Sequence, residues 1–295
     1  MGGLTIRKNN NILRTLMSAD ILTLPAYTSC QALLDAHLHE LQKRFGMAMW
    51  MITRLNGDDL ILLRVRDDHY GLHRGHRLQW QSSYCMRMIE QGAPRIVADV
   101  STQPDYLTAP INDDLTVGAY IGFPLVDADN QLFGTLCALD PQAQPVTLED
   151  ALPTLNHEAA LISFLLNNAV REAREKRLLT FVEHPDRCDA TGLPGHQAWQ
   201  DMYRQEASNC RDFGLEASVL YLQAPEDGDS LTIADSLAAL LREQDSIAHL
   251  GNNHFGILLA DTDKEKSCRV ADRIRDALNA KRLLVRIDRE ELISG

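Results

Sequence analysis

The sequence predicts an α+β protein of two domains joined by a long helix. Its 295 residues lie at the upper end of what one hydrophobic core holds, so two domains are expected. Strand-length apolar runs and helical apolar stripes follow one another in both halves. We therefore expect four parts, with these boundaries: an N-terminal segment at 1–19, a first domain at 20–147, a linker helix at 148–182 and a second domain at 183–295.

Composition narrows the class of protein. Hydrophobic residues make up 45% and charged residues 24% of the chain, which is typical of a folded soluble protein. The formal net charge of −12 argues against binding to nucleic acid, because no basic stripe offsets it. The sequence has no apolar run of about 18 residues and no signal-like start, so we expect a cytoplasmic protein with no membrane contact.

The cysteines and histidines do not form a recognisable ligand pattern. The six cysteines are scattered and include no C-x-x-C pair: Cys30, Cys85, Cys137, Cys188, Cys210 and Cys268. The cluster of His69, His73 and His76 contains Gly71 and Gly75, which disfavour the helix that would align the three rings. We expect no metal and no cofactor.

The first domain is predicted to hold an antiparallel sheet with helices beside it. Two helices are expected, each closed by a glycine: residues 20–45 before Gly46, and residues 82–91 before Gly92. Five strands are expected from apolar runs between turn residues: 47–53, 60–65, 95–99, 119–126 and 133–140.

Four motifs in this domain carry a family resemblance: Ser83-Tyr84-Cys85, GAPRIVAD at 92–99, AYIGFPL at 119–125 and FGTLCALD at 133–140. Over about residues 20–170 the chain resembles GAF domains. The resemblance implies a small-molecule and dimerisation module whose pocket lies on one sheet face, under the loop 99–117. The candidate pocket residues are Tyr84, Cys85, Tyr106 and Tyr120. The alternative is that these side chains are ordinary core.

Some relatives of this family use cysteines to reduce free methionine sulfoxide. That chemistry needs an attacking thiolate and a resolving thiol, and Cys85 and Cys137 are the pair that could supply them. A reductase is therefore a further alternative for the first domain.

The linker helix carries apolar residues at near-heptad spacing: Leu152, Leu155, Ala159, Ile162, Leu165, Leu166 and Ala169. Such a stripe favours a parallel homodimer through a coiled coil, and the alternative is a solvated connector. The stripe has no other obvious partner in the sequence, which is the reason for preferring the dimer.

The second domain is organised around a predicted hairpin, in which strands 246–250 and 255–260 flank Gly251, Asn252 and Asn253. Other predicted elements are a strand at 217–223, a helix at 230–243 and a last strand at 283–287. Three motifs in order, DATGLP at 189–194, Gly251-Asn252-Asn253-His254-Phe255 and ADRIR at 271–275, make the domain similar to the GGDEF family of diguanylate cyclases.

The resemblance implies an α/β domain that is truncated and degenerate. Family members hold magnesium with carboxylates at the third hairpin position and at the end of the first strand. Here the third hairpin position is Asn253, the strand 217–223 is followed at once by Ala224 and Pro225 and lacks the Asp, and the guanine-holding stretch is reduced to Asp227-Gly228-Asp229. The hairpin Gly251, Asn252, Asn253, His254 and Phe255 is thus a degenerate signature, and we expect no catalytic residue and no cyclase activity.

A regulatory feature of the family is retained. Arg242 and Asp245 match the R-x-x-D site that binds cyclic di-GMP, and Arg273 matches a second arginine of that site. An arginine fork can bind phosphate or the guanine edge, and a carboxylate can accept hydrogen bonds from guanine. The alternative is a surface ion pair between Arg242 and Asp245.

We expect a noncatalytic signalling protein in which a GAF sensor controls a GGDEF module that binds cyclic di-GMP or a protein partner. One alternative is an active cyclase that makes cyclic di-GMP from GTP with Asp227 or Asp229 as substitute ligands. Another is a scaffold that binds no nucleotide.

Overall fold

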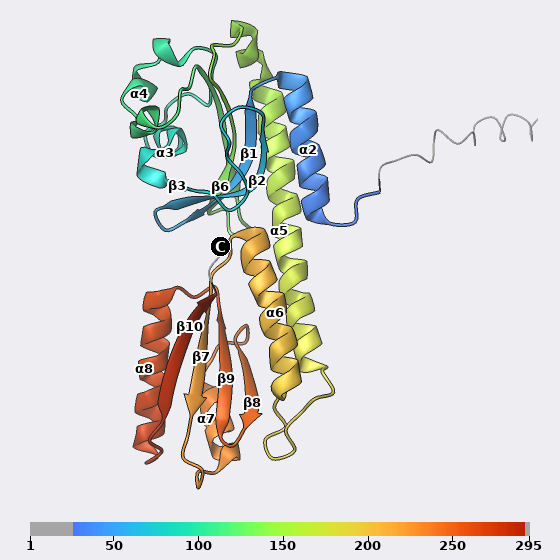
Figure 1. The fold of residues 1–295 in the computed structure, drawn as a ribbon, viewed down its shortest axis with the longest axis vertical. Coiled ribbons are helices and arrows are strands. Elements are labelled where there is room, and N and C mark those ends of the chain that lie inside the picture. The colour runs from blue at the N-terminus through green and yellow to red at the C-terminus, as the bar shows by residue number, and fades with distance from the viewer. Residues whose placement is uncertain (1–25, 293–295) are drawn as a thin grey trace, which may run out of the picture.

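The computed structural model describes residues 26–292, so the N-terminal segment at 1–19 lies outside the described residues. Two sheets stand one above the other along the long axis of the molecule, and a single long helix runs beside both of them (Figure 1). The architecture is mixed helix and sheet, as the sequence predicts.

The first domain contains a six-stranded antiparallel sheet of order β3-β2-β1-β6-β5-β4. Its strands are β1 Met49–Asn56, β2 Asp59–Asp67, β3 Arg77–Gln79, β4 Ile96–Val97, β5 Ala119–Val126 and β6 Leu132–Asp140. Its helices are α2 Cys30–Phe45, α3 Tyr84–Glu90 and α4 Pro104–Leu107. The sequence did not predict β3, whose three residues are too few for a periodic pattern. Helix α2 begins at Cys30 because the Ser29 hydroxyl caps it.

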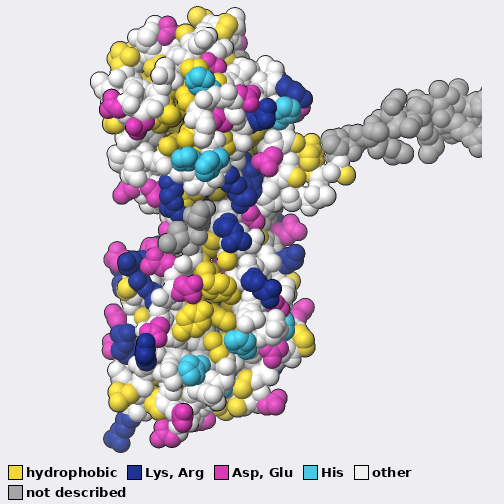
Figure 2. All heavy atoms as spheres, viewed as in Figure 1, with side chains coloured by type: hydrophobic (Ala, Val, Ile, Leu, Met, Phe, Trp, Pro, Cys, Tyr) yellow, Lys and Arg dark blue, Asp and Glu magenta, His cyan; other side chains and the backbone are white. Residues whose placement is uncertain are grey.

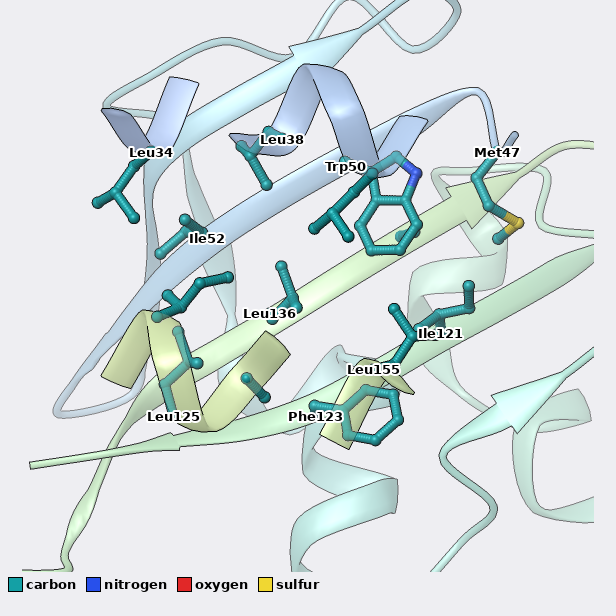
Figure 3. Close-up of a cluster of buried hydrophobic side chains, with 14 of the residues drawn as sticks. Leu34, Leu38, Met47, Trp50, Ile52, Ile121, Phe123, Leu125, Leu136 and Leu155 are labelled. Atoms are coloured by element: carbon teal, nitrogen blue, oxygen red, sulfur yellow. The ribbon is translucent and has the colours of Figure 1, made fainter. Parts of the chain in front are cut away.

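Helices cover both faces of this sheet. On one face, α2 and the long helix enclose a core that includes Leu34, Leu38, Trp50 and Phe123 (Figure 3). On the other face, α3, α4 and the loop between β4 and β5 enclose a second core that contains the three tyrosines of the candidate pocket.

The long helix α5, Leu152–Val182, follows a 3-10 turn at Val146–Ala151. Its stripe residues Leu155, Ala159, Ile162 and Leu166 are buried in the first domain's own core. Further along, Val170 and Phe181 are buried in the core of the second domain. The expectation that the stripe lacks a partner within the chain was therefore wrong, because the sheet and α6 cover it.

The second domain has a four-stranded antiparallel sheet of order β10-β7-β9-β8. Its strands are β7 Ala217–Gln223, β8 Ser246–Gly251, β9 His254–Ala260 and β10 Arg286–Leu292. Its helices are α6 His196–Phe213, α7 Ser230–Leu240 and α8 Lys264–Ala280. Helix α6 packs on one face beside α5, while α7 and α8 pack on the other.

Two predicted elements of this domain are shifted. Helix α7 ends at Leu240, not at residue 243, so Arg242 lies in the turn before β8. The last strand spans Arg286–Leu292, not 283–287. The prediction was placed too early because the Leu283–Val285 run is more apolar than the alternating, half-buried residues of the strand itself. The predicted hairpin is confirmed: Asn252 and Asn253 have φ of 48° and 56°, which a two-residue turn of this kind requires.

Candidate functional site

The third hairpin position, Asn253, is buried and fastens the hairpin to the loop after β7. Its amide nitrogen donates to the carbonyl oxygens of Pro225 at 2.7 Å and Gly228 at 2.8 Å. Its amide oxygen accepts a hydrogen bond from the Ser230 hydroxyl. Both the nitrogen and the oxygen of the amide are therefore hydrogen-bonded to this loop and the start of α7. Only 5% of the residue is exposed.

The end of β7 lies next to the start of β9. Gln223 at the end of β7 pairs with His254 at the start of β9, and both side chains are exposed. Magnesium prefers hard, preferably anionic, oxygen ligands. The amide of Asn253 presents its nitrogen to two carbonyls, and Gln223 and His254 bring no charge, so these residues do not fit a magnesium ion.

The loop after β7 also carries two aspartates, Asp227 and Asp229. Asp229 caps α7, because its carboxylate accepts from the backbone N–H groups of Leu231 and Thr232. The hydrogen bond from the Thr232 hydroxyl and these backbone bonds lower the pKa of Asp229. Asp227 is exposed. Within residues 26–292 there is no group of three or more His, Cys, Asp or Glu side chains placed to hold a metal ion.

Arg242 and Asp245 lie in the turn before β8, and Arg273 contacts the chain two residues before Arg242. The Asp245 carboxylate accepts from the backbone N–H of Arg242 at 3.0 Å and that of Ala260 at 3.3 Å. Arg273, on α8, donates to the carbonyl of Leu240 at 2.7 Å. Both arginine side chains are exposed, so their guanidinium groups face solvent around the same turn.

The geometry at Asp245 differs from a simple surface ion pair. In the part of the chain that the structure describes, the ion pairs do not include one between the Arg242 guanidinium and Asp245. Instead the carboxylate braces the turn through backbone bonds, and partial burial raises the pKa of Asp245. A groove of about 290 Å³ opens beside it, lined by Arg242 and Asp245 together with the apolar side chains of Phe181, Leu193 and Ile247.

Sequence reasoning missed Arg177, the residue of α5 that reaches this turn. Its guanidinium donates to the Gln244 carbonyl at 3.1 Å and the Ser246 hydroxyl at 3.0 Å. Its Nε lies 2.9 Å from the Glu206 carboxylate on α6. The available signal was its position, four residues before Phe181 on a buried helical stripe, where an arginine is unusual.

In the first domain, the four candidate pocket residues form one cluster. The ring centroids of Tyr84, Tyr106 and Tyr120 lie 4.7 to 5.3 Å apart, and the Tyr120 hydroxyl donates to the Cys85 sulfur at 3.6 Å. A cavity of about 20 Å³, lined by Tyr84, Cys85 and Tyr120 but not by Tyr106, lies beside the cluster and suffices for one water-sized molecule. The structure brings the four residues together, and their role as a ligand pocket stays a prediction.

Comparison with known families assigns both halves. Residues 28–167 match the family described as GAF domain, and residues 228–294 match the family described as diguanylate cyclase, GGDEF domain. The chain is a GAF domain followed by a GGDEF domain. The tyrosine cluster thus lies in the GAF domain, and Asn253 and Arg242 lie in the GGDEF domain.

Individual relatives are more distant. The curated "Probable diguanylate cyclase DgcC" of Escherichia coli (strain K12) is 27% identical over 128 residues, which cover 39% of this chain and 34% of that protein. The chain thus spans about a third of that relative. Among the described residues, no helix has the length and apolar character to cross a bilayer.

Two solved structures are among those to which the chain is similar. The GAF domain of an Acinetobacter phosphoenolpyruvate-protein phosphotransferase has 15% identity and a TM-score of 0.39, covering 56% of this chain and 93% of that one. The diguanylate cyclase SiaD of Pseudomonas aeruginosa, solved with its activator SiaC, has 19% identity and a TM-score of 0.35, covering 50% and 64%.

Proposed function

We propose that this chain is a noncatalytic protein of cyclic di-GMP signalling. Its GAF domain senses a small-molecule input, and its GGDEF domain binds cyclic di-GMP through Arg242, Asp245 and Arg273. Asn253 carries the noncatalytic part of this proposal, since its side chain holds a loop where a cyclase needs a metal-binding carboxylate. The binding part is supported by the convergence of two exposed arginines and one carboxylate beside a groove.

The proposed loss of cyclase activity rests on more than one residue near the hairpin. A carboxylate at position 253 would face the carbonyl oxygens of Pro225 and Gly228, so the surrounding loop is built for an amide. Two nearby residues also differ from metal ligands: Gln223 carries no charge, and the Asp229 carboxylate caps α7. Each lost transition-state contact lowers a rate by orders of magnitude.

The turn at 242–245 has the chemistry that a guanine nucleotide needs. Arginine presents a planar fork that binds either phosphate oxygens or the O6 and N7 atoms of guanine. A carboxylate has more acceptor sites than the two backbone N–H groups of Arg242 and Ala260 use at Asp245, so it can also accept from guanine. Figure 2 shows acidic and basic side chains interspersed over the face in view.

Isothermal titration of the folded chain with cyclic di-GMP and, separately, with GTP and magnesium tests the proposal. We expect cyclic di-GMP to bind and GTP to give no heat. No heat with cyclic di-GMP up to about 100 μM, a concentration corresponding to weak binding, would leave the turn as a structural element and the domain as a scaffold or protein-binding surface.

The alternative function is an active diguanylate cyclase that makes cyclic di-GMP from two GTP molecules. It is favoured only by the exposed carboxylate of Asp227 beside the hairpin loop. Incubation with GTP and magnesium, followed by chromatography of the nucleotides, separates the two functions. Turnover that Asp227→Ala abolishes would establish the alternative.

We also propose a homodimer, through a different face of α5 from the one the sequence suggested. Leu161, Phe164 and Leu179 are 42%, 65% and 58% exposed. Helical spacing puts these three side chains on one face, which points away from both domain cores. A second copy of α5 would cover this face.

A further inference from the structure

The buried cysteines Cys85 and Cys137 lie against each other although 52 positions separate them in the chain. Cys85 is on α3 and Cys137 is on β6, and their sulfur atoms are 2.9 Å apart. Both are free thiols in the structure. A disulfide bond is about 2.05 Å long, so less than about 1 Å of approach would join the two sulfurs.

Polar groups surround this pair inside an otherwise apolar core. The Thr135 hydroxyl lies 2.9 Å from the Cys137 sulfur and 3.3 Å from the Cys85 sulfur. The Tyr120 hydroxyl donates to Cys85 at 3.6 Å. Hydrogen bonds from Cys137, Thr135 and Tyr120 lower the pKa of the Cys85 thiol, whereas burial raises the pKa of Cys137. Cys85 is therefore the better nucleophile, since the thiolate is the reactive form.

The other cysteines have different surroundings: the Cys188 sulfur lies 3.0 Å from Nδ1 of His249, and the Cys30 thiol donates to the Leu165 carbonyl at 3.9 Å. Cys210 is buried in the GGDEF core, where burial raises its pKa to about 12. Cys268 is exposed on α8, where its sulfur accepts from Arg289. The cavity of about 20 Å³ beside Cys85 is lined mainly by apolar side chains, so it admits a small neutral molecule more readily than a charged one.

We propose that Cys85 and Cys137 form a reversible redox site of the GAF domain, which a small hydroperoxide oxidises to an intramolecular disulfide. The Cys85 thiolate attacks one peroxide oxygen, the O–O bond breaks, and the leaving oxygen takes a proton to become water. Cys85 then carries a sulfenic acid. The Cys137 sulfur attacks the Cys85 sulfur, the S–S bond forms, the S–O bond breaks, and the hydroxyl leaves with a proton as a second water.

The overall reaction is balanced: two thiols and one hydrogen peroxide give one disulfide and two water molecules, and the dithiol loses two electrons. The new bond would join α3 to β6, next to the tyrosine cluster. Strand β6 pairs with β1 and β5, and α5 packs against β5. The site is therefore connected through β6 and β5 to α5, the helix that leads to the GGDEF domain. This site does not depend on whether the GGDEF domain binds cyclic di-GMP.

The experiment is a thiol count with peptide mapping on the full chain. The protein is reduced, freed of reductant, treated with hydrogen peroxide, unfolded and alkylated. We expect two of the six cysteines to become unreactive to the alkylating agent, one linked peptide to contain Cys85 and Cys137, and dithiothreitol to restore both thiols. The linkage should form equally at low protein concentration, because it is intramolecular.

Two variants sharpen the test. Cys137→Ser should abolish the linked peptide and leave a sulfenic acid on Cys85 that dimedone traps, whereas Cys268→Ser should leave the linkage unchanged. If peroxide oxidises Cys268 while Cys85 and Cys137 both remain alkylatable, or if the linked peptide contains another pair, the proposal is wrong. The peptide map of the wild-type protein gives this answer even if Cys137→Ser does not fold.

Discussion

The guanidinium of Arg177 lies 2.9 Å from the carboxylate of Glu206, and the two side chains are only 1% and 3% exposed. This ion pair connects α5 to α6, and the same guanidinium donates to the residues on either side of Asp245. Helix α5, which leads out of the GAF domain, is therefore hydrogen-bonded to the turn that we propose binds cyclic di-GMP. Two buried charges are stable here because they are paired and hydrogen-bonded.

Removing one partner of this pair should destabilise the GGDEF domain. We expect Arg177→Met to lower the free energy of unfolding by about 3–5 kcal/mol, because Glu206 is then buried without a counter-charge. The double variant Arg177→Met with Glu206→Met should recover most of that loss. Urea denaturation followed by circular dichroism measures both. Arg171→Met on the exposed side of α5 is the control, expected within about 0.5 kcal/mol of wild type; an equal loss there would contradict the assignment.

Arg242→Ala should weaken cyclic di-GMP binding. Charge-assisted hydrogen bonds contribute about 1.5–3 kcal/mol, which corresponds to roughly tenfold or more in affinity. Arg242→Lys should recover only part of the affinity, since an ammonium cannot form the two-pronged contact. Titration calorimetry compares the variants. Arg275→Ala on α8, where Arg275 is paired with Asp272, is the matched control; if it weakens binding as much as Arg242→Ala, net charge and not the turn is responsible.

The stability contributed by Asp245 should depend on pH in the direction opposite to that of most carboxylates. Burial raises the pKa of Asp245 in the folded state, although backbone hydrogen bonds and Arg242 counteract it. The folded state thus binds this proton more tightly than the unfolded chain, so the contribution favours folding at low pH and is lost as the pH rises through the folded-state pKa.

Asp245→Asn removes this titration. Its free energy of unfolding relative to wild type should therefore rise as the pH increases from the ordinary aspartate value of about 3.9 towards neutrality. Urea denaturation of both proteins over a series of pH values checks this. A difference that stays constant with pH would show that burial does not perturb Asp245.

Restoring a carboxylate to the hairpin should destabilise the domain without restoring catalysis. Asn253→Asp replaces an amide donor with an acceptor that faces the carbonyls of Pro225 and Gly228, at a cost of about 1–3 kcal/mol or more. Denaturation measures the loss, and incubation with GTP and magnesium should show no cyclic di-GMP. His254→Ala, at the exposed neighbouring position, should be nearly neutral. Turnover of GTP by Asn253→Asp would contradict the proposal that the loop around residue 253 is built for an amide and cannot support catalysis.

The proposed dimer predicts that Leu161→Glu with Phe164→Glu halves the mass in sedimentation while helix content stays unchanged. Buried apolar side chains of this size contribute about 1.5–3 kcal/mol each, so two charges in their place should separate the copies. Ile162→Glu is the contrasting variant, expected to unfold the GAF domain because Ile162 is fully buried in its core. An unchanged mass for the double variant would show that this face is not the interface.

Sequence reasoning was most successful where a local pattern decides the structure. The turn at Asn252 and Asn253, the strand β7 and the single long helix α5 follow from positive-φ residues, apolar runs and helical spacing, which act over a few neighbouring residues. It was least successful at element ends. Helix α7 stops at Leu240 and β10 starts at Arg286, because packing and the turn braced by Asp245 set those limits.

The sequence by itself determined the two family resemblances, the α+β class and the absence of carboxylates at positions 223 and 253. These depend on the identity and order of residues. Only the tertiary structure decided what covers the stripe of α5, what Asn253 holds in place and which distant side chains meet, as Arg177 meets Glu206 and Cys85 meets Cys137. The physical reason is that burial and hydrogen bonding depend on distances between segments far apart in the chain, and no local pattern encodes those distances.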